Sequence, residues 1–358
     1  VHILDPFTGT GTFITRLLKS EILSQEQIFR KFNSEIHANE IVLLAYYIAC
    51  INIEAIYYDF FKEENYTSFS GLVLTDTFQL FEQERDMIAN LLPDNSNRRT
   101  QQKKKNIQII IGNPPYSIGQ TSASDNAANI SYPCLDKRIA ETFAKDSQST
   151  LLKGLYDSYI RAFRWAIDRI GNEGVIGFVS GAGWIDRNFA DGMRREIESN
   201  FEKIYIVNLR GDIRKNMLSG RTAGEGENIF GQGSMTGISI TILVKRKDTN
   251  KGEIKYFDIG DHKTKEEKLA LLEALKSIDG IEKLDKFDLI KPNSKYEWIN
   301  QGDIMFDKLD FLGNKLNDKK SIFTLYSLGV STNRDAWCFN FSKSYLKENI
   351  NKLITNFN

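Results

Sequence analysis

Short β-rich runs alternate with segments of helical periodicity over the first 245 residues of the chain. This order is typical of an α/β fold, in which helices cover both faces of a mostly parallel sheet. Several of the runs are continuously apolar, as expected for strands that are covered on both sides. The predicted strands are residues 1–4, 34–38, 71–74, 107–111, 175–179, 204–209 and 239–244.

The same periodicity predicts two helices and one strand pairing. Residues 40–55 are apolar nearly all round, which predicts a buried helix. The last two predicted strands are separated only by the Gly-rich residues 211–237, so we expect them to form an antiparallel pair. A second helix is predicted over residues 156–170, where apolar side chains form one stripe at steps of three and four: Tyr156, Tyr159, Ile160, Phe163, Ile167 and Ile170.

The composition is that of an ordinary globular protein. A length of 358 residues suggests about two domains, 41% of the residues are hydrophobic, and 47 acidic residues balance 47 basic ones. Zero net charge argues against a protein that binds polyanions through basic tails, although it leaves a local basic groove open. The longest apolar stretch, residues 41–53, is shorter than the ~20 residues needed to span a membrane, so we expect no membrane partner.

Cysteine and histidine usage indicates a reducing compartment and no structural zinc. Cys50, Cys134 and Cys338 are odd in number and far apart, so we expect no disulfide framework and a cytoplasmic location. The histidines have no metal-ligand spacing to these cysteines, so we expect no metal site. The chain begins with Val1 inside a predicted strand, which indicates a piece of a longer polypeptide.

A glycine turn follows the first predicted strand. Residues 5–13 read Asp-Pro-Phe-Thr-Gly-Thr-Gly-Thr-Phe, and such a turn lets the backbone and the N–H groups of the next helix approach a ligand. A P-loop would need Lys where the chain has Thr12, and a dinucleotide fingerprint would need Gly at Ile14. Asp5 can accept a hydrogen bond from a ligand ammonium, such as that of S-adenosylmethionine. An ordinary strand-to-helix turn remains the alternative.

The second motif, Asn113-Pro114-Pro115-Tyr116, follows the strand at 107–111. Prolines have no N–H, so the local carbonyl groups are free to accept hydrogen bonds from a ligand. Asn113 adds a side-chain acceptor and Tyr116 an aromatic face, which together suit a planar group that bears an NH₂. A Pro-rich turn with a buried Tyr is the alternative, but the carboxyl end of a strand is where open α/β sheets bind ligands.

At this order and spacing, the two motifs resemble the gamma-type amino-methyltransferases of DNA, and the adenine-specific ones in particular. The resemblance implies a Rossmann-like, mostly parallel sheet of seven strands with an antiparallel edge pair, and S-adenosylmethionine as the cofactor. It implies that Glu40 binds the cofactor ribose and Asp76 its adenine, although Asp76 could equally open a helix. The cofactor-binding residues would be Asp5, Pro6, Phe7, Thr8, Gly9, Gly11, Glu40 and Asp76, and the catalytic residues Asn113, Pro114, Pro115 and Tyr116.

Further motifs resemble the methylase part of large single-chain, type ISP-like restriction-modification enzymes: Tyr156-Asp157-Ser158-Tyr159, Gly183-Trp184-Ile185-Asp186 and Asn208-Leu209-Arg210-Gly211-Asp212. In those enzymes nuclease and helicase parts precede the methylase in the same polypeptide, and a target-recognition domain follows it. Asn333-Arg334-Asp335-Ala336-Trp337 resembles the entry to that domain. We therefore expect a methyltransferase domain over 1–245, lacking the family's N-terminal helix. A connecting segment with a charged helix at 264–277 would fill 246–290, and the target-recognition domain would begin in 291–358.

The resemblance implies methylation of N6 of a flipped-out adenine in double-stranded DNA. Basic residues near the catalytic edge would bind the DNA phosphates: Arg187, Arg194, Arg195, Arg210, Arg214 and Arg221. A basic loop at residues 98–105 is the weaker candidate. Other planar NH₂ groups remain open as substrates, namely cytosine N4, an RNA base or a protein glutamine. A non-catalytic DNA-recognition module of a restriction enzyme is the alternative from another class.

Overall fold

The computed structural model describes residues 1–62, 66–82, 91–116, 132–149, 151–218, 224–231, 235–247, 251–303, 305, 308–313, 320–323, 325, 332 and 334–357. Contacts divide the chain into two compact units, Val1–Gln301 and Gly302–Asn358.

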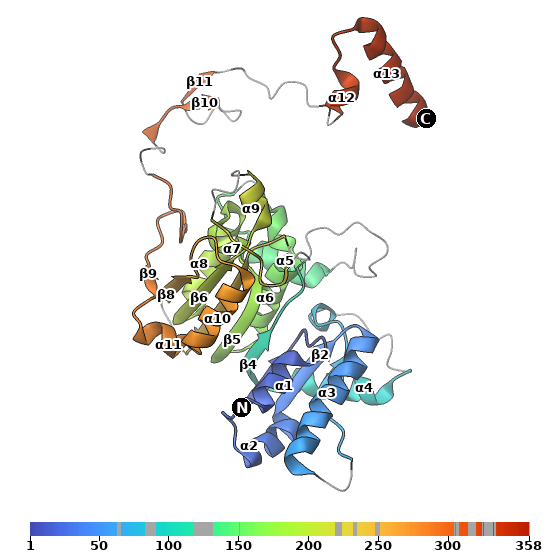
Figure 1. Ribbon diagram of the computed structural model, residues 1–358, viewed down its shortest axis with the longest axis vertical. Coiled ribbons are helices and arrows are strands. Elements are labelled where there is room, and N and C mark those ends of the chain that lie inside the picture. Colours follow the sequence, from blue (N-terminus) through green and yellow to red (C-terminus); the bar gives the residue numbers. More distant parts are fainter. Residues whose placement is uncertain are drawn as a thin grey trace. The chain divides into compact units, whose positions relative to one another are not determined.

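A mixed sheet runs through the first unit (Figure 1). Its described strands follow the order β3-β2-β1-β4-β5-β7-β6-β8-β9. Strands β1 to β5 pair in parallel, whereas β7 lies antiparallel between β5 and β6, and β9 is antiparallel to β8. The strands are β1 (His2–Asp5), β2 (Ile36–Glu40), β3 (Leu72–Leu74), β4 (Ile107–Gly112), β5 (Gly174–Gly181), β6 (Lys203–Arg210), β7 (Ile238–Lys245), β8 (Glu253–Asp258) and β9 (Asp288–Ile290).

The predicted α/β fold is confirmed, with a mostly parallel sheet and an antiparallel β6–β7 pair. The number of strands differs from the prediction, because nine described strands replace the expected seven. The β6–β7 pair is also not at the edge, since β8 pairs in parallel with β6 and extends the sheet.

Helices cover both faces of this sheet. Side chains alternate along β6, so Ile204 and Ile206 belong to one buried cluster while Val207 and Leu209 belong to another. The helices of this unit are α1 (Thr12–Leu18), α2 (Gln25–Arg30), α3 (Leu43–Phe61), α4 (Pro93–Lys104), α5 (Pro133–Glu141), α6 (Ser158–Arg169), α7 (Gly183–Asp186), α8 (Asp191–Asn200), α9 (Ile213–Leu218), α10 (Lys265–Leu275) and α11 (Ile278–Lys283).

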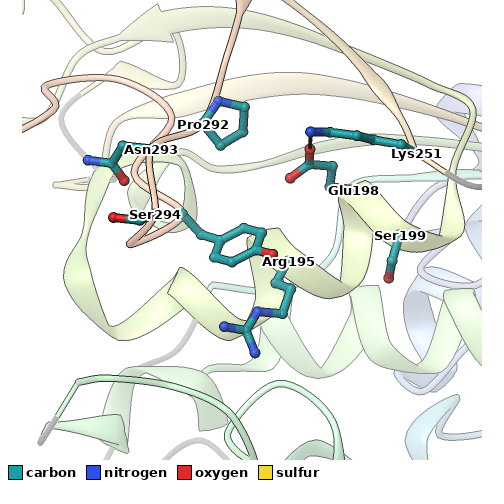
Figure 2. Close-up of a pocket in the computed structure, with 8 residues that line it drawn as sticks. Arg195, Glu198, Ser199, Lys251, Pro292, Asn293 and Ser294 are labelled. Atoms are coloured by element: carbon teal, nitrogen blue, oxygen red, sulfur yellow. Dashed lines mark ion pairs between the residues drawn. The ribbon is translucent and has the colours of Figure 1, made fainter.

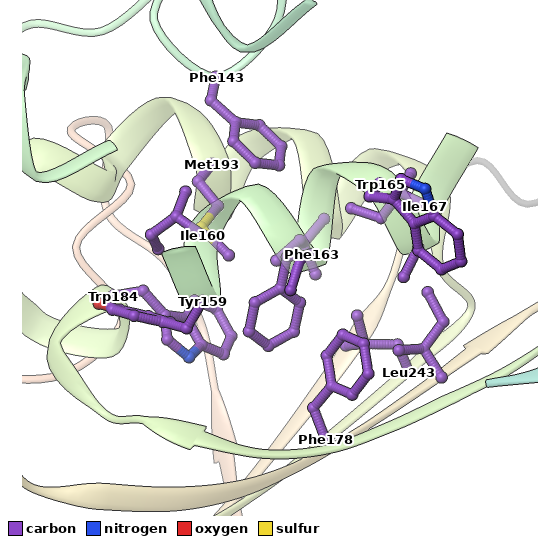
Figure 3. Packing of buried hydrophobic residues seen from close by; sticks show 14 of the residues in the cluster. Phe143, Tyr159, Ile160, Phe163, Trp165, Ile167, Phe178, Trp184, Met193 and Leu243 are labelled. Atoms are coloured by element: carbon purple, nitrogen blue, oxygen red, sulfur yellow. The ribbon is translucent and has the colours of Figure 1, made fainter. Parts of the chain in front are cut away.

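The predicted helix at 156–170 is confirmed as α6, and its apolar stripe forms the centre of the main core (Figure 3). Phe163 packs edge-on against Phe178 of β5, with ring centroids 5.3 Å apart, and lies 5.5 Å from Trp184 of α7. The core therefore joins β5 to the short helix that follows its carboxyl end.

Two local predictions were wrong. The helix predicted as buried, α3, buries only one face through Ala49, Ile53, Ile56 and Tyr57, because it covers the sheet edge from one side. Leu44 on the other face is 70% exposed and Ile51 is 65% exposed. The basic residues predicted as a loop at 98–105 lie instead at the end of α4, where Lys103 and Lys104 occupy the last helical turn.

The second unit contains β10 (Phe311–Gly313), β11 (Ser321–Phe323), α12 (Asp335–Cys338) and α13 (Lys343–Phe357). Strands β10 and β11 pair in parallel. Among the helices described in the chain, none combines the length and the apolarity that crossing a membrane requires.

Candidate active site

The glycine turn between β1 and α1 adopts a backbone that requires glycine. Gly9 and Gly11 have φ angles of 56° and 87°, in the left-handed region. A Cβ atom on Gly11 would lie 3.3 Å from the Ile53 side chain of α3, whereas one on Gly9 would meet nothing within 4 Å. Gly11 therefore permits helix packing, and Gly9 leaves open space at the end of the sheet.

Asp5, the last residue of β1, is fully buried at 0% exposure. Its Oδ1 accepts a hydrogen bond from the Phe7 amide at 3.1 Å, but its Oδ2 has no partner among the described residues. Burial raises the pKa of Asp5 to about 7, and the nearby Glu40 carboxylate adds to that rise. A buried acceptor of this kind is costly unless a ligand donor completes it, and a ligand ammonium fits that requirement.

Glu40 ends β2 and reaches across to the glycine turn. Its Oε2 accepts a hydrogen bond from the Gly9 amide at 2.7 Å, and its Oε1 accepts one from the Val42 amide at 2.7 Å. Two predicted cofactor residues that are distant in sequence are thus in direct contact.

Backbone and hydroxyl contacts hold the rest of the turn. The Thr8 amide donates to the Asn39 carbonyl at 3.0 Å, and the Thr77 hydroxyl donates to the Pro6 carbonyl at 2.5 Å. Asn39 in turn donates its side-chain amide to Thr77 Oγ1 at 3.1 Å. Asn39 precedes Glu40 and Thr77 follows Asp76 in the sequence. This proximity to predicted cofactor residues could have identified both of them as candidate site residues.

Asp76 lies between β3 and the short 3₁₀ helix η2 (Phe78–Leu80). Its Oδ1 accepts a hydrogen bond from the Phe78 amide at 2.9 Å, as a residue that opens a helix would. Its Oδ2 accepts one from the Tyr132 hydroxyl at 2.8 Å. Tyr132 was not predicted, because nothing in its local sequence relates it to Asp76.

The ring of Phe7 points into the protein. Its centroid lies 5.5 Å from that of Phe78 and 6.5 Å from that of Phe178. Phe7 thereby packs the glycine turn against the residues that follow β3 and against β5.

The Asn-Pro-Pro-Tyr motif follows β4, which pairs directly with β1. Asn113 and Pro115 are exposed, Pro114 is buried and Tyr116 is half-buried. The Tyr116 hydroxyl lies within hydrogen-bonding distance of Asn113 Oδ1 and, at 3.0 Å, of the Val179 carbonyl of β5. One hydroxyl hydrogen cannot satisfy both acceptors fully, so the Asn113 oxygen can still accept a hydrogen bond from a ligand.

Both motifs lie where the strand order reverses. From β1 the sheet continues to β2 and β3 on one side and to β4 and β5 on the other. Open α/β sheets bind ligands at the carboxyl ends of strands at this point. Asp5, Glu40, Asp76 and Asn113 lie at or just after the carboxyl ends of β1, β2, β3 and β4. They therefore lie at the same edge of the sheet.

The predicted DNA-binding arginines have different environments. Arg194 is 1% exposed, and its guanidinium donates to the carbonyls of Tyr296, Trp184 and Arg187. Arg187 pairs with Asp212 at 2.9 Å. These contacts make Arg194 part of the packing around α7 and leave it no room to bind a phosphate.

The remaining arginines are more accessible. Arg210 pairs with Asp258 and with Asp261, each at 2.6 Å. Arg214 is exposed on α9, and Arg221 lies outside the described residues.

Arg195 lines a hollow of about 330 Å³ on α8 (Figure 2). Its guanidinium lies 4.6 Å from the centre of the Tyr296 ring and 3.4 Å from Asp146, and Lys251 pairs with Glu198 across the same hollow. This hollow contains none of the predicted cofactor or catalytic residues.

Residues 321–358 match the family described as Type ISP C-terminal specificity domain. A search of curated proteins finds no match. The solved structures to which the chain is similar include three that match it over its whole length.

The first is the ATP-dependent Type ISP restriction-modification enzyme LlaBIII bound to DNA, with 43% identity and a TM-score of 0.90. A nuclease-deletion mutant of the Type ISP enzyme LlaGI, in complex with a DNA substrate mimic, has 44% identity and a TM-score of 0.88. The DrdV–DNA complex has 34% identity and a TM-score of 0.85.

The chain spans 24%, 29% and 34% of these three proteins respectively. The similarity extends over both units, since each of the three structures covers 100% of the chain. Over its whole length the chain therefore corresponds to the methyltransferase and target-recognition portion of a Type ISP restriction-modification enzyme.

Proposed function

We propose that the chain transfers a methyl group from S-adenosylmethionine to N6 of adenine in double-stranded DNA, as the modification part of a restriction-modification enzyme. The observation that carries this proposal is the common sheet edge of the two motifs. Asp5 ends β1, Glu40 ends β2, and Asn113 follows β4, the other neighbour of β1. A methyl donor and a planar amine bound there would lie side by side.

The residues after β1, β2 and β3 fit S-adenosylmethionine. The unpartnered Oδ2 of Asp5 would accept a hydrogen bond from the cofactor ammonium. Glu40 would bind the ribose hydroxyls, and Asp76 would bind the adenine amino group. When bound, the cofactor supplies a methyl group on a positively charged sulfur, which is an electrophile.

The residues after β4 fit a planar NH₂ group. Asn113 Oδ1 and the Pro114 carbonyl would accept its two hydrogens, which favours the pyramidal geometry in which the nitrogen lone pair can attack. The Tyr116 ring would stack on the base, which must leave the duplex to reach this edge. Holding amine and methyl group in line supplies much of the rate.

The partners follow from the relatives. LlaBIII and LlaGI are described as bound to DNA or to a DNA substrate mimic, LlaBIII as ATP-dependent, and LlaGI as having a nuclease that was deleted. For this chain we propose double-stranded DNA as the substrate and nuclease and helicase parts in the same polypeptide. The cytoplasm, where its free cysteines stay reduced, is the proposed location.

Phosphate contacts are proposed for Arg187, Arg195, Arg210, Arg214 and Arg221. They are not proposed for Arg194, whose guanidinium is buried among carbonyl groups.

The experiment that tests the proposal incubates the full-length protein and radiolabelled S-adenosylmethionine with unmethylated plasmid DNA, with RNA and with protein. Label should enter DNA alone, and Asn113→Ala should lower the rate by ~100-fold or more, as removing one transition-state hydrogen bond does. Asn106→Ala, an exposed residue at the other end of β4, is the matched control.

Two outcomes would contradict the proposal. Label in RNA or protein instead of DNA would assign another planar amine. DNA binding without any methyl transfer would indicate a non-catalytic recognition module.

A further inference from the structure

Tyr132 connects the start of α5 to the residue after β3. Its buried side chain donates the hydroxyl hydrogen to Asp76 Oδ2 at 2.8 Å, across 56 residues of sequence. Asp76 Oδ1 is held at the same time by the Phe78 amide. Because both carboxylate oxygens accept hydrogen bonds, the plane of the Asp76 carboxylate is fixed.

Two side chains contact the ring of Tyr132. The Phe78 ring meets it edge-on, with centroids 5.2 Å apart. The Arg161 guanidinium lies 5.4 Å from the centre of the Tyr132 ring and pairs with Asp136 through two bonds of 2.7 and 2.9 Å. The hydroxyl is therefore confined to a small region beside Asp76.

Glu82 anchors α5, the helix that begins directly after Tyr132. Its carboxylate accepts hydrogen bonds from the amides of Cys134 and Leu135, at 2.9 and 3.0 Å. These bonds satisfy free N–H groups at the start of α5, so they stabilise its position relative to the residues after β3.

We infer that Tyr132 is a positioning residue for the cofactor adenine, because it orients Asp76 so that a free lone pair faces the adenine amino group. This inference rests on the proposed function and adds a residue to it. A carboxylate that rotated freely would present that lone pair only part of the time, and its hydrogen bond to the amino group would be weaker.

The hydrogen bond from Tyr132 also affects the protonation of Asp76. Burial raises the pKa of Asp76, whereas the hydrogen bonds from Tyr132 and from the amides of Phe78 and Gln79 lower it. The charged side chains beside Tyr132, Arg161 and Asp136, neutralise one another. Removing the Tyr132 hydroxyl should therefore raise the pKa of Asp76 further and weaken cofactor binding most at acidic pH.

The test is calorimetric titration of the full-length protein with S-adenosylhomocysteine and with S-inosylhomocysteine, which lacks the amino group, between pH 6 and 8. Tyr132→Phe should weaken S-adenosylhomocysteine binding by about five- to tenfold, and more at pH 6 than at pH 8. It should change S-inosylhomocysteine binding by less than about twofold. Tyr256→Phe, which removes a tyrosine–aspartate hydrogen bond on β8 instead, is the matched control and should change neither.

Equal affinities of wild-type and Tyr132→Phe protein for S-adenosylhomocysteine at every pH would overturn the inference. So would an equal loss for both ligands, or an equal loss in Tyr256→Phe, since each would indicate a general packing effect. If the wild-type protein bound neither ligand, the proposed function itself would fail, and the inference with it.

Discussion

A single residue, Asp5, should make the stability of the protein depend on pH. Burial raises its pKa to about 7, above the ordinary value near 4. The folded state therefore binds a proton more tightly than the unfolded chain, so the stability of the cofactor-free protein should fall as pH rises from about 4 to 7. Above pH 7 the protein holds a buried negative charge, which a cofactor ammonium would compensate.

Replacing Asp5 with Asn should separate stability from cofactor binding. At pH 8, Asp5→Asn should raise the melting temperature by about 2 °C or more, because the buried charge is gone. Binding of S-adenosylmethionine should strengthen from pH 6 to pH 8 in the wild-type protein and stay weak and flat in the variant. Thermal melts and titration calorimetry measure both, and wild-type cofactor affinity in Asp5→Asn would contradict this role.

Those candidate site residues that lie in local motifs could be proposed from the sequence. Asp5, Glu40 and Asn113 lie at or just after strand ends, and the structure brings the strands that carry them together. Tyr132 could not be predicted in the same way, because its contact with Asp76 depends on where α5 packs.

For one arginine, the sequence suggested a DNA-binding role that the folded structure excludes. Arg194 was expected at a DNA surface because it belongs to the series of arginines near the predicted catalytic edge. Its guanidinium instead satisfies three backbone carbonyls around α7. Those carbonyls come from segments that only the folded chain brings together.

At the scale of an element, α3 has two apolar faces in different environments. Ile53→Ala should destabilise the protein by about 2–5 kcal/mol, because it leaves a cavity beside Gly11. Ile51→Ala, two positions earlier on the exposed face, should change the free energy of unfolding by no more than about 0.5 kcal/mol. Urea denaturation of the two variants measures the difference, and similar losses would show that the exposed face is covered.

A second element, the segment 224–231, depends on one lysine of α10. The fully buried Lys268 ammonium donates to the carbonyls of Glu225 and Glu227, at 3.1 and 2.6 Å. Lys268→Met would leave these carbonyls without that donor and should cost about 1–3 kcal/mol.

Amide hydrogen exchange measures how Lys268→Met affects the segment 224–231. The amides of Glu227 and His262, which bond across this segment, should exchange faster in the variant. The exposed Glu273→Gln on the same helix is the control and should leave these rates unchanged. Unaltered exchange in Lys268→Met would show that other contacts hold the segment.

At the scale of the whole molecule, the sheet extends further than its sequence indicates. Strand β8 carries Glu253, Lys255 and Asp258 among its apolar residues, so it does not read as a covered strand. Lys255 is compatible with a strand because it pairs with Glu282 at 2.7 Å. Strands such as β4 were predictable because they are almost continuously apolar. Strand β8 was not, because its charges are paired only in the fold.

The proposed DNA binding would also depend on the whole molecule. Because phosphate contacts dominate such binding, Arg214→Glu should weaken DNA affinity by ~10-fold at 0.1 M salt and reduce its salt dependence. Lys19→Glu, at the end of α1, should have no such effect, and both variants should bind S-adenosylmethionine normally. Fluorescence anisotropy with labelled duplex DNA measures the affinities, and an unchanged affinity in Arg214→Glu would remove that residue from the DNA surface.

The sheet edge that carries Asp5 and Asn113 is proposed to methylate adenine in DNA. The most direct test is mass spectrometry of nucleosides from DNA that has been incubated with the full-length protein and S-adenosylmethionine. We predict N6-methyldeoxyadenosine with the wild-type protein and none above background with Asn113→Ala. N4-methyldeoxycytidine in its place, or no methylated nucleoside from a protein that binds both cofactor and DNA, would contradict the claim.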